Sequence, residues 1–501
     1  MGLHDFTFYD LIRRNAVSFG NRTAWLEVDD GRTMTFSEIK ERTDRLARGL
    51  RGMGVNKGDR IAVVAKNSLE YFLLFGAASA LGAVMLPVNW RLSAEEVSYI
   101  LQDGEPKVLF ADPDSTEMIQ AMKKGLPSVE KHVELGAGLS GLLESEAPPL
   151  DGAVGVDDGL VIIYTAAVAG RPRGALLSHG NVLCANMHFN YLMNVTAGDV
   201  HLCFLPLFHV GGLFMTAAAF HAGALNINMS RFDAVKAVDL IRERGVSFMM
   251  VFSPILASIL EEHEKTGKTI GSLRAVTGID TKETIEKYQA LTGGTFFSLY
   301  GQTETSCLAT FGAYDERPGA AGKILPLAEV MLVDDYDRPV PAGQVGEITV
   351  RGPMVFRGYW RLPEDTAYTF REGRHHTGDL GRFDEEGFLW YAGRKAEKEL
   401  IKPGGENVYP AEVEKAILQH PAVDKTVVFG VPDPKWKEGI KAVCVIKEGQ
   451  SLEAAALIDF VGKQIARYKK PQYVEFVAQL PLTADGAVDR AKVKALYGGE
   501  K

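Results

Sequence analysis

A regular alternation of short apolar runs with amphipathic segments constrains the fold of this chain more than any other feature. The apolar runs indicate buried strands at residues 60–64, 84–87, 108–111 and 160–164. The segments between them are typical of helices, at residues 68–81 and 94–101, and Ser37 is expected to cap an earlier one. Strand and helix alternate again between residues 233 and 299. This pattern predicts an α/β fold with mostly parallel sheets flanked by helices.

The chain changes character after the alternating region. Short strands and turns between residues 330 and 390 indicate a β-rich, more antiparallel section. The charged segment 395–399 is the expected hinge between a large N-terminal domain, residues 1–394, and a small α+β C-terminal domain, residues 400–501. In the small domain we expect helices at 411–419 and 452–466 and strands at 425–429 and 441–447. A length of 501 residues agrees with more than one domain.

Composition excludes several classes of protein. A net charge of -9 argues against a nucleic-acid partner, which normally requires a basic excess. The 4 cysteines are scattered without metal-ligand spacing, as in reduced cytoplasmic proteins. Residues 72–90 and 201–230 carry no charged side chain, but glycine, proline and histidine interrupt them, so buried core is expected rather than an integral membrane segment. No signal peptide is visible, and the oligomeric state stays open, with a homodimer among the options.

The stretch from Tyr300 to Thr305, Tyr-Gly-Gln-Thr-Glu-Thr, follows an apolar run that is expected to be a strand. Ligands of open α/β sheets bind where strands end. A ring, a hydroxyl and a carboxylate at this place could stack a base, bind a phosphate and hold Mg²⁺, which takes one or two carboxylates. The alternative is a polar turn after a buried strand. Further motifs follow in the chain, at residues 205–212, 376–380, 393–394 and 404–412.

Taken together, these motifs and their order resemble the adenylate-forming superfamily of acyl-CoA synthetases, peptide-synthetase adenylation domains and beetle luciferases. The resemblance covers nearly the whole chain. It implies that Tyr300, beside Gly301, stacks on adenine, that Thr303 binds the α-phosphate and that Glu304 holds Mg²⁺. These roles favour a nucleotide site over the polar turn.

The same resemblance also indicates which residues bind the ribose of the nucleotide. Asp379, in His-Thr-Gly-Asp-Leu, would accept hydrogen bonds from the ribose hydroxyls, and Arg394 would add a guanidinium. A turn residue is the alternative for Asp379, because Gly-Asp is common in loops. The adenine loop of the family is altered here to residues 277–280, in which Gly278 is expected at the nucleotide and Thr277 at the acyl substrate.

Residues 205–212, Leu-Pro-Leu-Phe-His-Val-Gly-Gly, resemble the family motif whose histidine lies between the adenylate and the thiol. A histidine among apolar residues is more often a core residue, but the flanking pattern favours a catalytic role for His209. Val210, Gly211 and Gly212 would then line the acyl pocket, because small residues leave room for a carbon chain or ring.

Residues 404–412, Gly-Gly-Glu-Asn-Val-Tyr-Pro-Ala-Glu, resemble the signature of the CoA-ligating branch and assign Gly404, Gly405 and Glu406 to the cofactor site. The preceding segment is two residues longer than the commoner spacing, so Lys398 and Glu399 both remain candidates for the hinge residue. The segment 467–471, Arg-Tyr-Lys-Lys-Pro, matches a further family motif, and a solvated basic face explains it equally well.

Two departures from the family stand out. The phosphate loop, residues 165–174, keeps Thr165, Gly170 and Arg173 but lacks three of the hydroxyls. Backbone amides could still bind phosphate, and Arg173 keeps the positive charge. Near the C-terminus, Ala487 stands where the family has the lysine of the adenylation step. Either the sequence is an engineered variant or the protein adenylates slowly, and the intact surrounding motif favours engineering.

The sequence therefore predicts an AMP-forming acyl-CoA ligase that uses ATP, Mg²⁺ and coenzyme A to activate a small-molecule carboxylic acid. Two alternatives remain open. One is an adenylating enzyme that does not use CoA, and the other is a non-catalytic relative that binds nucleotide or acyl-CoA. The identity of the acid depends on packing around residues 210–215 and 252–256, which the sequence does not reveal.

Overall fold

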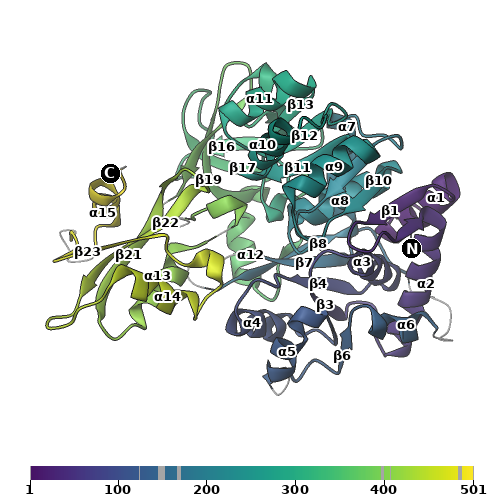
Figure 1. Ribbon diagram of the computed structural model, residues 1–501, viewed down its shortest axis with the longest axis horizontal. Coiled ribbons are helices and arrows are strands. Elements are labelled where there is room, and N and C mark those ends of the chain that lie inside the picture. The colour runs from purple at the N-terminus through teal and green to yellow at the C-terminus, as the bar shows by residue number, and fades with distance from the viewer. Residues whose placement is uncertain are drawn as a thin grey trace.

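The computed structural model describes residues 2–122, 125–144, 153–165, 171–395, 400–406, 408–482 and 488–499. Figure 1 shows a large body formed by the N-terminal part of the chain, with a smaller C-terminal unit against one side of it. The predicted α/β class is confirmed. The predicted hinge falls almost entirely on residues 396–399, which lie outside the described ranges.

Two large sheets organise the body. The first has the order β15 (Lys323–Ile324), β14 (Thr310–Ala313), β13 (Thr295–Tyr300), β12 (Ala275–Ile279), β11 (Phe248–Phe252), β9 (Val200–Cys203), β10 (Leu225–Asn228), β1 (Thr23–Glu27) and β2 (Thr33–Thr35). Its central strands, from β13 to β1, are parallel. The second has the order β18 (Gly358–Tyr359), β8 (Arg173–Ser178), β7 (Gly159–Thr165), β4 (Val84–Val88), β3 (Arg60–Val64), β5 (Val108–Ala111) and β6 (Lys131–Glu134).

The main hydrophobic core lies between these sheets. It joins residues of both sheets with five helices, α1 (Phe8–Phe19), α2 (Phe36–Gly52), α3 (Leu69–Leu81), α7 (His179–Leu192) and α8 (Val210–Ala222). The helices α3 and α8 are apolar all round and are buried all round, as such helices must be. Residues 72–90 and 201–230 thus belong to the core, as expected from their interruptions.

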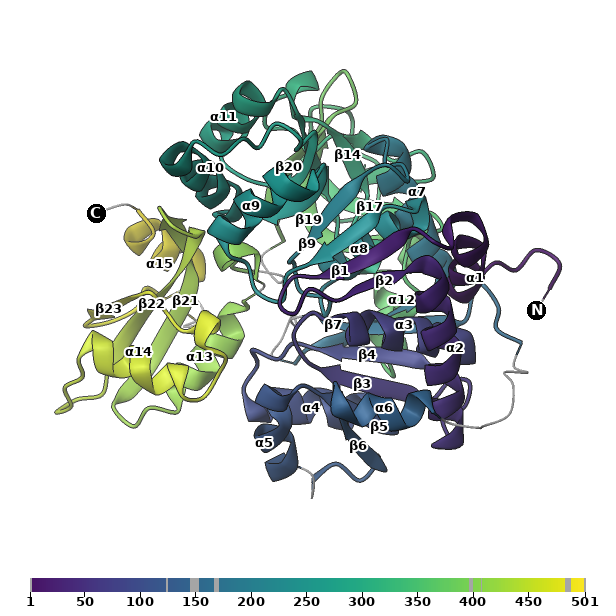
Figure 2. The ribbon, with the colours of Figure 1, turned by 45° about the vertical axis from the view of Figure 1, so that its right-hand side comes forward.

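Outer helices cover the remaining faces of the two sheets (Figure 2). The first sheet is covered by α9 (Ala234–Arg244), α10 (Ile255–Thr266) and α11 (Lys282–Thr292). The second is covered by α4 (Ala94–Gly104) and α5 (Pro113–Met122), while α6 (Ala137–Leu143) packs on α2. The result is a layered α/β body, and ligands of such folds bind at the carboxyl ends of the parallel strands.

The β-rich section contains a four-stranded antiparallel sheet of β16 (Glu329–Val333), β17 (Gly346–Arg351), β19 (His375–Phe383) and β20 (Leu389–Arg394). It is not wholly β, because the helix α12 (Pro363–Thr369) follows β18. The small unit consists of α13 (Pro410–Leu418), β21 (Val423–Asp433), β22 (Lys437–Ile446), α14 (Ala454–Gly462), β23 (Tyr473–Val477) and α15 (Arg490–Tyr497). The helices α13 and α14 cover one face of its sheet, and α15 covers the other.

Most predicted elements are present with ends shifted by a few residues, and two expectations need correction. The cap of α2 is Thr35, whose hydroxyl accepts the amide of Glu38 while the Glu38 carboxylate accepts the amide of Thr35. Ser37 is already inside that helix. The helix expected at residues 452–466 is shorter and spans Ala454–Gly462.

Candidate active site

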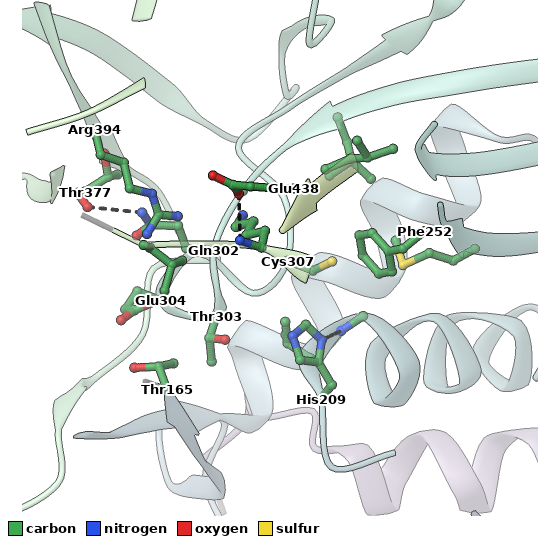
Figure 3. A pocket seen from close by; sticks show the side chains of 18 of the residues that line it. Thr165, His209, Phe252, Gln302, Thr303, Glu304, Cys307, Thr377, Arg394 and Glu438 are labelled. Carbon is green, nitrogen blue, oxygen red and sulfur yellow. Dashed lines mark hydrogen bonds between the residues drawn. The ribbon is translucent and has the colours of Figure 1, made fainter. Parts of the chain in front are cut away.

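The predicted site residues come from the carboxyl ends of strands in both large sheets. Tyr300 ends β13, Thr165 ends β7, and His209 follows β9. They line two adjoining cavities of about 740 and 300 Å³, which share residues that include Gly301 and Arg394. Figure 3 shows Thr165, Thr303 and Glu304 on one side of the smaller cavity and His209, Cys307 and Phe252 on the other. The topology thus brings together motifs that lie far apart in the sequence.

Asp379 is the centre of a buried polar cluster at the larger cavity. Its carboxylate accepts the Tyr300 hydroxyl at 2.8 Å and the side-chain amide of Gln302 at 2.5 Å. Arg394 forms an ion pair with it at 2.8 Å between Nε and Oδ1. The Tyr300 ring stacks at 6.2 Å on the ring of Tyr391, which lines the same cavity. The turn interpretation of Asp379 does not explain a carboxylate that is 2% exposed and bonded by three side chains.

Gly278 lies at the same cavity, where the backbone is too crowded for any side chain. A β-carbon at this position would come within 1.8 Å of the Val251 carbonyl oxygen, and φ is 141°. Thr277 lies elsewhere. Its hydroxyl donates to the Phe297 carbonyl at 3.1 Å inside the sheet, and it lines neither cavity. The structure therefore gives no support to the expectation that Thr277 contacts the acyl substrate, which stays a prediction.

Glu347 supports the turn that carries Gly378 and Asp379. Its carboxylate accepts the amide of Gly378 at 2.9 Å and pairs with Lys395 at 3.0 Å. Burial opposes its charge, but hydrogen bonds from His376 and Lys395 lower the pKa of Glu347 to about 2. Glu347, His376 and Asp337 lie close enough to hold a metal, yet the ion pairs with Lys395 and Arg371 already supply the positive charge. We interpret the cluster as support for the Gly378–Asp379 turn.

Glu304 and Thr303 face the smaller cavity from the short helical turn after β13. Glu304 is 7% exposed and accepts the Tyr359 hydroxyl at 2.9 Å through one oxygen. In the described part of the chain its other oxygen accepts no hydrogen bond, so it is available to a cation. One carboxylate at a phosphate site fits Mg²⁺, which prefers few protein ligands.

Arg173 lies beside this carboxylate but is already engaged. Its guanidinium pairs with Asp365 at 2.8 Å, donates to the Tyr359 hydroxyl at 3.3 Å and covers the Tyr359 ring at 4.0 Å. It lines the smaller cavity together with Thr165, so the two ends of the altered phosphate loop meet there. Gly170, between them, is outside the described residues.

His209 caps the helix α8 and lines the smaller cavity. Its Nδ1 accepts the amide of Gly211 at 3.3 Å, and burial lowers the pKa of His209, which favours the neutral ring. Val210 and Gly211 line the cavity as expected. Gly212 does not line the cavity. It packs against the backbone, where a β-carbon would lie 2.3 Å from the Pro206 carbonyl oxygen. Its small size serves backbone packing, so the structure gives no support to its predicted role in the acyl pocket.

The small unit reaches the site through the turn that carries Gly404, Gly405 and Glu406. Glu406 forms an ion pair with Arg91, which follows β4 in the large body. Gly404, Glu406, Arg91 and His209 line a third cavity of about 250 Å³. His209 therefore lines both this cavity and the smaller of the two adjoining cavities.

A second ionic contact joins the small unit to the body. Lys469 is 3% exposed and pairs with Glu96 at 2.5 Å and with Glu412 at 2.7 Å. Glu96 lies in α4 of the body, and Glu412 lies in α13 of the small unit. The solvated basic face, one of the two interpretations of residues 467–471, is therefore wrong for Lys469. Ala487 is outside the described residues.

Sequence reasoning missed several residues of the site. Lys402 and Glu438 line both adjoining cavities, and Tyr359 holds Glu304. Lys402 precedes the predicted Gly-Gly-Glu signature and could have been included for that reason. Glu438 and Tyr359 stand in strands without any local pattern, so only the fold reveals them.

Comparison with known proteins identifies the family. Residues 12–360 match the AMP-binding enzymes, and residues 412–487 match the AMP-binding enzyme C-terminal domain. The chain belongs to this family, the adenylate-forming superfamily. The prediction made from the motifs is thereby confirmed, together with the enzyme class, an AMP-forming acid–thiol ligase.

Individual relatives cover both domains. Indoleacetate–CoA ligase from Aromatoleum aromaticum is 34% identical over 479 residues, which are 93% of each chain. The fatty acid–[acyl-carrier-protein] ligase ScoC from Streptomyces coeruleorubidus is 34% identical over 490 residues, 94% of this chain and 93% of that one. A double mutant of o-succinylbenzoate CoA synthetase from Bacillus subtilis, bound with its product analogue, superimposes with a TM-score of 0.87 and 27% identity over 98% of both chains.

Within the described ranges, every helix is too short or too polar to cross a bilayer.

Proposed function

We propose that the protein activates an apolar monocarboxylic acid with ATP and transfers the acyl group to coenzyme A. In the first step a carboxylate oxygen attacks the α-phosphorus and pyrophosphate leaves. In the second step the CoA sulfur attacks the carbonyl carbon of the acyl-adenylate and AMP leaves. The observation that carries the proposal is that Tyr300 and Asp379, Thr303 and Glu304, and His209 line one set of cavities.

At the nucleotide end, Asp379 and Arg394 bind the ribose hydroxyls while Tyr300 and Tyr391 provide aromatic surface for adenine. The cavity of about 740 Å³ that they line is large enough for a nucleotide. Because Tyr300 and Gln302 both donate to Asp379, the carboxylate is fixed before the ligand arrives. Such preorganisation lowers the entropy lost on binding.

At the phosphate end, Thr303 donates to the α-phosphate and Glu304 holds the cation that accompanies ATP. When bound there, Mg²⁺ neutralises phosphate charge, and Glu304 supplies the ligand oxygen described above. Arg173, held by Asp365, adds a fixed positive charge beside the same oxygens. Fixed charges of this kind stabilise, without reorganisation, the negative charge on the oxygens of the five-coordinate phosphorus.

At the thiol end, the neutral ring of His209 lies between the acyl cavity and the third cavity. Since Nδ1 accepts the Gly211 amide, the proton of the neutral ring is on Nε2, which can donate to the carbonyl oxygen during thiol attack. The ion pairs of Arg91 with Glu406 and of Lys469 with Glu96 hold the small unit at this approach. We assign the observed orientation to the transfer step. The high TM-score with a relative that carries a product analogue supports this assignment.

The acyl end of the smaller cavity supports an apolar acid. Beyond His209 it is lined by Val210, Met250, Phe252, Leu299 and Cys307, and none of these carries a charge. A second carboxylate enclosed by these five side chains would have no counter-ion among them, at a cost of several kcal/mol, although Lys402 and Lys437 line other parts of the same cavity. Aromatic and aliphatic monocarboxylic acids are therefore the expected substrates, as for the relatives that act on indoleacetate and fatty acids.

A panel of acids tests this proposal. We expect AMP release that depends on both ATP and CoA with aryl-acetic, cinnamic and medium-chain fatty acids, and none with dicarboxylic acids of similar length. Mass spectrometry identifies the acyl-CoA product. Turnover of dicarboxylic acids would refute the apolar assignment. Failure to form any acyl-CoA, by the parent protein and by Ala487→Lys, would refute the ligase itself and favour a binding protein, which calorimetry with AMP and CoA would then reveal.

An acyl-carrier protein is a second candidate for the thiol acceptor. The observation in its favour is the 34% identity to a relative that is an acyl-carrier-protein ligase, equal to that with the CoA ligase. Competition between CoA and a carrier protein bearing phosphopantetheine, at equal thiol concentration, distinguishes the two acceptors.

A further inference from the structure

Tyr409 belongs to the small unit, yet it lines the smaller cavity together with Thr303 and Glu304 of the body. It comes directly before α13, a few residues after the turn that carries Gly404 and Glu406. The proposed function assigns it no role. Its side chain is only partly exposed, and its hydroxyl forms no hydrogen bond with any residue in the described ranges. A phenol of this kind is free to donate to a ligand.

The backbone around Tyr409 is fixed on both sides. Pro410 occupies the first position of α13, and a proline restricts the preceding residue to an extended conformation, which Tyr409 has with φ -89° and ψ 131°. On the other side, Val408 and Ile401 exchange two backbone hydrogen bonds of 2.8 and 2.9 Å. The position of the phenol is therefore set before a ligand arrives, which is what electrostatic catalysis requires of a donor.

The charged groups around Tyr409 indicate which part of the nucleotide it faces. Its hydroxyl interacts electrostatically with Arg394 and Asp379, which form the ribose end of the site. It also interacts with Glu304 and Arg173, which form the phosphate end. A group that is influenced by both ends lies between them. In an adenylate, the α-phosphate is the group that follows the ribose, so Tyr409 lies beside the position of this phosphate.

The phenol of Tyr409 keeps its proton at neutral pH. Burial raises the pKa of Tyr409 to about 12, and the carboxylate of Glu304 acts in the same direction. A protonated phenol donates one hydrogen bond, and phosphate oxygens only accept. Tyr409 is therefore suited to bind a phosphate oxygen as a neutral donor.

We propose that Tyr409 is a catalytic residue of the transfer step, in which its hydroxyl donates a hydrogen bond to the phosphate of the leaving AMP. This inference rests on the proposed function, because it concerns the second step of the same reaction. In that step the bond between sulfur and the carbonyl carbon forms, and the bond from that carbon to the phosphate oxygen breaks. The electron pair of the broken bond stays on the phosphate, and the thiol proton goes to solvent. The phosphate gains negative charge, so a donor beside it binds more tightly as the step proceeds.

The two steps should respond differently to the loss of this hydroxyl. Tyr409 moves with the small unit, and the observed orientation is the one that we assign to transfer. Tyr409→Phe should lower kcat for transfer from preformed acyl-adenylate to CoA by about tenfold, the effect of one hydrogen bond to a charged group. KM for CoA should stay within twofold of the parent value. Pyrophosphate release should be unchanged, both in the parent background and in that of Ala487→Lys.

A binding measurement separates contact with the phosphate from a structural role. By calorimetry, Tyr409→Phe should bind AMP about tenfold more weakly than the parent protein does. It should bind adenosine equally well, because adenosine has no phosphate. The thermal melt should be unchanged, because the hydroxyl has no hydrogen-bond partner in the described parts of the protein.

Tyr473→Phe is the matched control. Tyr473 is also a tyrosine of the small unit, and it begins β23. Its hydroxyl donates to Asp433 at 2.8 Å, and it lines none of the three cavities of the site. This variant should leave both steps and both ligand affinities within twofold of the parent.

Several outcomes would overturn the inference. If the parent protein transfers its acyl group and Tyr409→Phe does so equally fast, Tyr409 has no part in the step, while the proposed function stands. Equal slowing of pyrophosphate release would contradict a role confined to transfer. Equal weakening of adenosine and AMP would make Tyr409 a structural residue. If the parent protein forms no acyl-CoA from preformed acyl-adenylate, the proposed function fails and this inference fails with it.

Discussion

Replacement of Asp379 by asparagine should weaken AMP and ATP binding together, because both nucleotides share the ribose. Asparagine keeps the size of the side chain but removes its charge. The three donors that now converge on Asp379 come from Tyr300, Gln302 and Arg394. An amide presents one oxygen and one NH₂ group, so it cannot accept from donors on both sides.

The magnitude follows from these contacts. A carboxylate offers about four acceptor sites, and three are used within the protein, so roughly one remains for a ribose hydroxyl. Charge-assisted hydrogen bonds are worth about 1.5–3 kcal/mol each. Loss of one such bond should weaken nucleotide binding tenfold to hundredfold, because about 1.4 kcal/mol corresponds to a factor of ten in affinity.

The same substitution should also lower thermal stability. Arg394 would lose the counter-ion of a nearly buried pair, and breaking such a pair costs about 3–5 kcal/mol when the remaining charge is fully enclosed. Asparagine can still accept from Arg394, and the Arg394 side chain is 16% exposed, so the loss should be smaller. In a domain of this size the melting temperature should fall by no more than about 5 °C.

Calorimetric titration with AMP and with ATP, beside a thermal melt, measures both effects. Asp334→Asn is the control, because Asp334 pairs with Arg338 at 2.8 Å in an exposed turn of the same β-rich section. It should leave both affinities unchanged. Equal AMP affinity in Asp379→Asn and the parent protein would refute the ribose role and leave Asp379 a purely structural residue.

Other substitutions separate the steps. Glu304→Gln should keep the fold and reduce ATP-dependent turnover by at least about a hundredfold, since an amide is a poor Mg²⁺ ligand; turnover within a few-fold of the parent would exclude the metal role. Lys469→Met should slow transfer from preformed acyl-adenylate to CoA about tenfold through loss of its bond to Glu96, and leave pyrophosphate release unchanged. Ala487→Lys should raise pyrophosphate release by about a hundred- to a thousandfold and leave transfer unchanged.

The strands that could be predicted, such as β3, β5 and β7, are short apolar runs between turn residues, whereas β6, Lys131–Glu134, is not apolar and was not predicted. The motif residues could be predicted because they follow those strands, as Tyr300 follows residues 295–299. The structure does not support the acyl roles expected for Gly212 and Thr277, and the two cases have a common reason. A small residue beside a motif can serve backbone packing as well as a ligand, and only the positions of Pro206 and Phe297 decide which.

Contacts between distant segments could not be predicted. Arg91 and Glu406 are 315 positions apart, and Lys469 and Glu96 are 373 apart, so no periodicity links them. Each of these side chains, taken alone, has the pattern of a solvated surface residue. Their burial follows from the docking of one folded unit on another, a property that local sequence does not encode.

The ionic contacts of the small unit and the identity of residue 487 both affect the equilibrium between its two orientations, one for adenylation and one for transfer. Two ionic contacts, Arg91 with Glu406 and Lys469 with Glu96, favour the orientation that we assign to transfer. The family lysine would favour the other orientation by its attraction to ATP phosphates, and alanine at 487 supplies none of that attraction. A ligand shifts such an equilibrium only through its differential affinity for the two states. ATP should therefore change the domain orientation of Ala487→Lys, measured by fluorescence transfer between labelled domains, more than that of the parent protein. Equal shifts in both proteins would mean that ATP acts through the body alone.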